Sequence, residues 1–152
     1  MAFDLHAIQV DIKTYLESTF PQYEFYRNTV PEDKSVPRQG EEVNPFFVLQ
    51  FGQLYKRPRG GSMKGPRNDQ YYSWVQVISM GSVDDDISAA LALITDRLIG
   101  YKAPSGSAPL ELDGGMSDYG SRQYSVRPVL YYETQRFEFN VNQQGVGSYL
   151  SA

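Results

Sequence analysis

Few side chains in this sequence have the types and spacing that catalysis or metal binding requires. His6 is the only histidine and there is no cysteine, which excludes any site within one chain that needs two imidazoles, a thiolate or a disulfide. A Ser-His-Asp triad built on His6 would lie on the first turn of a predicted helix, and the sequence signals no geometric partners for it. We therefore expect His6 to be a helix-surface residue and the protein not to be an enzyme.

Two motifs resemble ligand sites without matching them. The segment GGSMKGP at 60–66 departs from a phosphate-binding loop because Lys64 precedes its glycine, and Ser62 lacks the spacing of a nucleophile elbow. Asp84, Asp85 and Asp86 are consecutive, so on a helix their carboxylates point in different directions and suit the helix dipole rather than one cation. The sequence thus predicts no cofactor and no metal site.

One segment concentrates positive charge. It runs from 56 to 67 and contains no acid, and its five cations are Lys56, Arg57, Arg59, Lys64 and Arg67. Because the whole chain carries a net charge of −4, the remainder carries −9. This basic segment suits a solvated hairpin tip, an acidic protein partner or a nucleic acid, although the acidic remainder would repel DNA.

Two amphipathic helices are predicted around this segment. Asp4 is placed to cap a helix whose apolar residues recur with the 3.6-residue period and which Pro21 bounds. The second helix is expected from about Val83 to Ile99. We expect Ser82 and Asp85 to form its capping box, and Gly100 to end it.

Strand patterns account for most of the remaining chain. Tyr23–Asn28 is strand-like, and the strands Pro45–Tyr55 and Gln70–Met80 flank the basic segment, which predicts a long antiparallel hairpin with a projecting tip. A short strand is possible at Leu110–Leu112. The stretch Arg122–Val141 is predicted to be one long bent strand rather than a tight hairpin near Glu133–Gln135, and its Pro128 indicates an edge position or a bulge.

These elements predict an α+β domain: a mostly antiparallel sheet with two amphipathic helices packed on one face and a long basic hairpin loop. With 152 residues, we expect a single domain over 1–141 and a flexible C-terminal arm over 142–152. The other sheet face carries many Tyr and Phe, so it requires cover from loops or from a neighbouring subunit. No stretch approaches the roughly 20 apolar residues of a membrane span, and we expect a cytoplasmic protein.

The order of these elements and their residue patterns resemble those of a known family, the tail-terminator (tail-completion) proteins of long-tailed bacteriophages. The resemblance covers nearly the whole chain and has no signature motif. It rests on DLHAIQVDIKTYLESTF at 4–20, PFFVLQFGQLY at 45–55, YYSWVQVISM at 71–80, DDDISAALALITDRLIG at 84–100 and VRPVLYYETQRFEF at 126–139. The Pro-rich segment Pro31–Pro45 matches no general feature of that family.

The resemblance implies a structural virion subunit at the tail–neck junction, assembled in the host cytoplasm. Such a subunit would form a homo-oligomeric ring, a hexamer, on the last ring of tail-tube protein, end tube polymerisation and join a head-completion protein of the neck. The basic segment would then meet an acidic face of the next copy or line the lumen through which DNA passes. Three alternatives stay open: another neck subunit, a small nucleic-acid-binding module using the basic loop 56–67 and exposed tyrosines, and an enzyme whose site only the fold would reveal.

Overall fold

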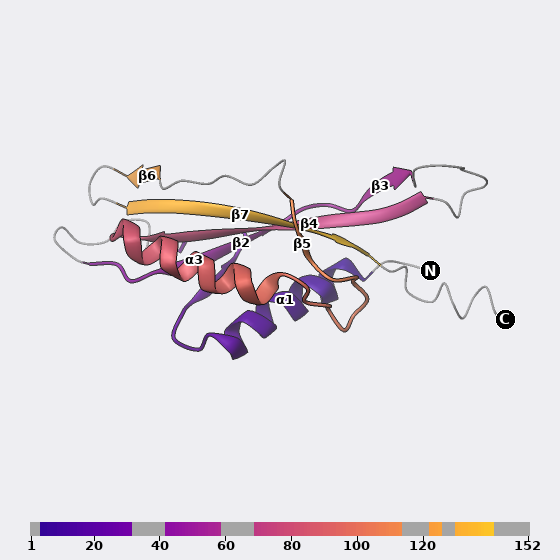
Figure 1. The fold of residues 1–152 in the computed structure, drawn as a ribbon, viewed down its shortest axis with the longest axis horizontal. Helices are drawn as coiled ribbons and strands as arrows, with labels where there is room; N and C mark the ends of the chain where they lie inside the picture. The colour runs from indigo at the N-terminus through magenta and orange to yellow at the C-terminus, as the bar shows by residue number, and fades with distance from the viewer. Residues whose placement is uncertain (1–3, 32–41, 59–68, 114–121, 126–129, 142–152) are drawn as a thin grey trace.

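The computed structural model describes residues 4–31, 42–58, 69–113, 122–125 and 130–141 (Figure 1). Within these ranges the chain forms two helices and seven strands, which belong to one sheet. In chain order they are α1 Leu5–Thr19, β1 Phe25–Arg27, β2 Phe46–Phe51, β3 Tyr55–Pro58, β4 Asp69–Gly81, α3 Asp84–Leu98, β5 Glu111–Leu112, β6 Arg122–Ser125 and β7 Leu130–Asn140. The predicted arm at 142–152 lies outside the described residues.

Helix α1 begins and ends where the sequence predicts. The Asp4 side chain accepts a hydrogen bond from the backbone N–H of Ala7 at 3.2 Å, which satisfies one of the free amides of the first turn. Ile8, Ile12 and Leu16, spaced four residues apart, are fully buried on one face. The helix therefore packs by a narrow aliphatic stripe.

Helix α3 also forms as predicted, but its predicted capping box is wrong. Val83 is the N-cap residue and makes no side-chain cap hydrogen bond. The Ser82 hydroxyl instead accepts from the Val43 N–H at 2.6 Å and lies 3.1 Å from the Val43 carbonyl, so it holds the chain entering β2 rather than the helix. Gly100 adopts a positive φ of 85° just after the helix, as expected for a terminating glycine.

The sheet is mostly antiparallel, which confirms the predicted fold class. Its order is β1-β2-β4-β7-β5, with β3 pairing β4 and β6 pairing β7. Strands β2 and β3 both pair with β4 and are separated by a break at Gly52–Leu54. Strand β1 is the exception because it runs parallel to β2. At its end Asn28 adopts a positive φ of 61°, and its side-chain carbonyl accepts from the Phe51 N–H at 3.2 Å.

The prediction of one long bent strand over Arg122–Val141 is wrong. Strands β6 and β7 pair antiparallel, with Gln123 opposite Tyr131 and Ser125 opposite Leu130, so the chain reverses between Ser125 and Leu130. The register is irregular between Gln123 and Ser125. Strand β7 continues through Glu133–Gln135, where no hairpin was expected. Pro128 lies outside the described residues.

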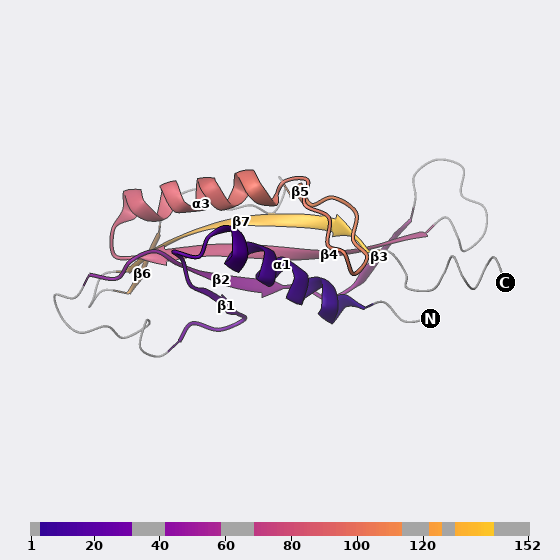
Figure 2. The same ribbon diagram turned by 90° about the horizontal axis from the view of Figure 1, so that it is seen from below.

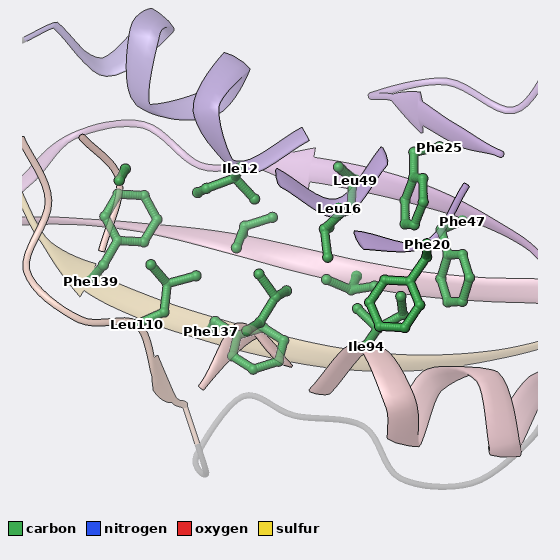
Figure 3. Packing of buried hydrophobic residues seen from close by; sticks show 14 of the residues in the cluster. Ile12, Leu16, Phe20, Phe25, Phe47, Leu49, Ile94, Leu110, Phe137 and Phe139 are labelled. Atoms are coloured by element: carbon green, nitrogen blue, oxygen red, sulfur yellow. The ribbon is translucent and has the colours of Figure 1, made fainter. Parts of the chain in front are cut away.

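Both helices lie on the same face of the sheet (Figure 2). The main core lies between the layers, where aliphatic side chains of α1 and α3 meet aromatic side chains of β2 and β7 (Figure 3). Phe47, Phe137 and Phe139 supply its largest rings and are 2% exposed or less. Residues of β2 and β4 alternate between this core and the opposite face, because successive side chains of a strand point to opposite sides of the sheet.

The helix-free face of the sheet carries a second, smaller apolar cluster. Phe46, Val48 and Met80 are its buried sheet residues, and Leu130 joins them from β7. Val43 is also buried there, so the chain entering β2 covers this end of the face. Tyr26, Val30, Ile78 and Tyr132 are partly buried and pack against this cluster.

Candidate interaction surface

Strands β3 and β4 form a two-stranded ribbon that extends past the helix layer (Figure 1). Among the described strands, β7 pairs with β4 only from Tyr72 onward, so Asp69 and Gln70 pair with β3 alone. Lys56 is exposed on this ribbon, and Arg57 is opposite Gln70. The predicted hairpin is therefore confirmed, and it carries the first two cations of the basic segment.

The other three predicted cations, Arg59, Lys64 and Arg67, lie outside the described residues. The fold thus brings Lys56 and Arg57 together on one strand and gives no position for the remaining three. Figure 2 shows the same ribbon leaving the sheet at the end away from the start of α3. The described cations lie where the two-layer core ends.

Aromatic and polar side chains gather on the helix-free face at the base of the ribbon. The rings of Tyr55 and Tyr72 stack with centroids 6.0 Å apart and planes inclined by 24°. The Tyr55 hydroxyl donates to the Glu138 carboxylate, which ties β3 to β7 across β4. These three half-buried side chains form the first part of what we term the aromatic patch.

Trp74 occupies the middle of the aromatic patch. Its indole lies against Gly52, in the break between β2 and β3, so closely that a Cβ on Gly52 would be 2.6 Å from its Cδ1 atom and nearer still to Nε1. The Arg136 guanidinium lies 4.0 Å from the ring centroid, a cation–π contact, and donates to the Gln76 side-chain carbonyl at 3.0 Å. Trp74, Gln76 and Arg136 complete the patch.

The sequence anticipated an aromatic face here but not this arrangement. Trp74 and Arg136 are 62 positions apart in the sequence, and only the register that places Gln76 opposite Arg136 brings them together. The one signal in the sequence is the period of two residues along 70–80, which places Tyr72 and Trp74 on a common face of a strand. The patch contains one cation and one carboxylate, each held by neighbouring side chains, so it suits binding rather than proton transfer.

The other sequence candidates for chemistry take structural positions. His6 is exposed on the first turn of α1, and its Nδ1 atom faces Arg27 rather than a nucleophile. Asp84, Asp85 and Asp86 are all exposed in the first turn of α3, where the helix dipole favours carboxylates. Among the described residues no three side chains of His, Cys, Asp or Glu are grouped so that they could hold a metal ion. The segment GGSMKGP lies outside those residues.

Comparison with known proteins gives no family for this chain. No protein-family model matches it, and no curated protein is significantly similar. In the part of the chain that the structure describes, neither helix has the length and apolar character needed to cross a membrane.

Proposed function

We propose that this chain is a tail-terminator subunit of a long-tailed bacteriophage. It assembles into a homo-oligomeric ring, a hexamer, that caps the tail tube, ends tube polymerisation and presents a surface to the head-completion protein of the neck. Its site of action is the tail–neck junction of the virion. The subunit acts by binding protein neighbours and performs no chemistry.

The observation that carries this proposal is the β3–β4 ribbon. A two-stranded ribbon that leaves the core has little stability of its own, so contact with another surface would stabilise it. Lys56 and Arg57 begin a segment of five positive charges on a chain with net charge −4. A ribbon with a net positive charge on a subunit with a net negative charge favours contact between copies or with DNA in the lumen.

The aromatic patch supports the same proposal. Tyr55, Tyr72 and Trp74 are only half-buried within one chain. Aromatic side chains and arginine are enriched at protein interfaces, where they contribute most of the binding energy. The patch is continuous with the ribbon through Tyr55, so one surface includes both.

Native mass spectrometry tests the proposal directly. The expected result is a ring of defined stoichiometry at micromolar concentration, whose assembly weakens when Lys56 and Arg57 are both replaced by alanine. Replacing the exposed Lys102, which follows α3 and is not part of β3 or β4, provides a charge control. A strict monomer at all concentrations would contradict the proposal.

A nucleic-acid-binding module is the second candidate, and the Tyr55–Tyr72 stack beside the basic ribbon favours it. Aromatic rings next to cations provide stacking platforms for unpaired bases. This candidate predicts a monomer whose affinity for single-stranded DNA falls steeply with salt and falls again when Tyr55 is replaced. If ring assembly survives the ribbon substitutions while DNA affinity is lost, the ribbon is a lumen element rather than a contact between subunits.

A further inference from the structure

Among the described residues, the guanidinium of Arg27 has no acidic partner. Its Nη2 atom donates to the Gln9 side-chain carbonyl, and its Nη1 atom lies 3.3 Å from Nδ1 of His6. The guanidinium carbon lies 5.8 Å from the centroid of the Phe51 ring. Its Nε atom is buried and makes no hydrogen bond. No described carboxylate is within ion-pair distance of these nitrogens.

This environment positions a cation without neutralising it. A guanidinium can only donate hydrogen bonds, so the Gln9 carbonyl accepts from it, and His6 Nδ1 accepts in the tautomer that leaves this nitrogen without a proton. Partial burial of a charge is costly unless an opposite charge accompanies it. The two observed contacts use one N–H of each terminal nitrogen, which leaves the guanidinium able to take a carboxylate. Arg27 is therefore held in place for an anion that the described chain does not supply.

The first turn of α3 carries carboxylates that form no ion pair with a described residue. Asp84, Asp85 and Asp86 are exposed at the start of α3, and none of them forms an ion pair with a described residue. Helix α3 packs against β4 and β7, whereas Arg27 is the last residue of β1, the edge strand against which α1 packs. A contact between these two sites joins unlike surfaces of two molecules, which is the arrangement that generates rings.

We propose that Arg27, held by Gln9 and His6, anchors the contact between copies of this chain by binding an aspartate from the first turn of α3 of the neighbouring copy. This proposal rests on the proposed ring-forming function and names one of its contacts. The acceptor is an acidic side chain presented by protein, and Gln9 and His6 act as positioning residues for Arg27.

The substitution Gln9→Glu tests the role of Arg27 with little change in shape. A glutamate at this position places a carboxylate beside the guanidinium within the same chain, so it competes with the neighbouring copy. We expect the dissociation constant for self-association to rise by about tenfold while the melting temperature stays equal or rises. Self-association equal to that of the unsubstituted protein, at equal stability, would overturn the proposal.

Charge exchange tests the identity of the acceptor. Arg27→Glu should abolish association, as should joint replacement of Asp84, Asp85 and Asp86 by lysine, and mixing the two variants should restore a complex that contains both. The control is Arg97→Glu at the exposed C-terminal end of α3, which should associate normally. If Arg27→Glu abolishes association and the lysine variant does not, α3 is not the acceptor. If the unsubstituted protein forms rings and Arg27→Glu does too, only this inference fails, whereas a monomeric unsubstituted protein contradicts the proposed function itself.

Discussion

Replacing Gly52 with alanine should destabilise the sheet beneath Trp74. The added Cβ would lie 2.6 Å from Cδ1 of the indole and closer to Nε1 and Cε2, well inside van der Waals contact. Gly52 does not have a positive φ, so the clash and not backbone strain is responsible. Overpacking of this kind costs about 1–3 kcal/mol. Moving the indole also weakens its contact with Arg136, which adds about 0.5–1 kcal/mol.

Together these terms give a loss of about 1.5–4 kcal/mol, or a melting temperature lower by about 3–16 °C for a chain of this size. The assay is thermal and urea unfolding followed by circular dichroism, with the fluorescence of the single tryptophan, Trp74, as a local reporter. In a Trp74→Leu background the cost of Gly52→Ala should fall below about 1 kcal/mol, because the smaller side chain leaves room for the methyl group.

The matched control for this cycle is Gly100→Ala. No heavy atom lies within 4 Å of a Cβ at Gly100, but its φ of 85° strains any other residue. Its cost of about 1–2 kcal/mol should be the same with Trp74 or Leu at position 74. An undiminished cost of Gly52→Ala in the Trp74→Leu background would refute the assignment of the clash to the indole.

Two further predictions concern helix α1 and its neighbours. Asp4→Ala removes the observed cap of α1 and should lower the free energy of unfolding in urea by about 1 kcal/mol. Asp85→Ala removes no cap hydrogen bond and should lower it by less than half as much. Equal losses in the two variants would contradict the cap assignment. Burial and the nearby charge of Asp11 raise the pKa of the Tyr101 hydroxyl, and the Tyr101 ring stacks on Tyr15 with centroids 4.1 Å apart. As pH rises, the unfolded state therefore loses the hydroxyl proton before the folded state does, so the stability of the fold should fall above about pH 10. Tyr101→Phe should show a shallower loss in melting temperature between pH 9 and 11, and an unchanged slope would exclude this tyrosine as a source.

Much of the fold follows from local patterns in the sequence. The helices were predictable because their buried residues recur every three or four positions between clear end signals, as Ile8, Ile12 and Leu16 do. The faces of β2 and β4 were predictable because alternation fixes which side each residue takes. Neither pattern specifies a partner strand or its direction, so the parallel pairing of β1 with β2 was not anticipated.

The remaining differences have three separate causes. Ser82 has the right spacing for a capping box, but its hydroxyl binds the backbone of Val43, which is distant in sequence. The reversal between Ser125 and Leu130 was missed because the sequence there lacks the glycine or asparagine signals of tight turns. Arg27 gave no signal at all, since its significance depends on the absence of a nearby described carboxylate.

The measurement closest to the central claim is tail-tube growth in the presence of the purified chain. We expect tube protein from a phage that carries this chain to polymerise until the chain is added, and electron microscopy should then show one ring at a single end of each arrested tube. Arrest should occur at about one ring per tube end, far below one chain per tube subunit. Continued growth with no chain on the tubes would contradict the proposed tail-terminator function.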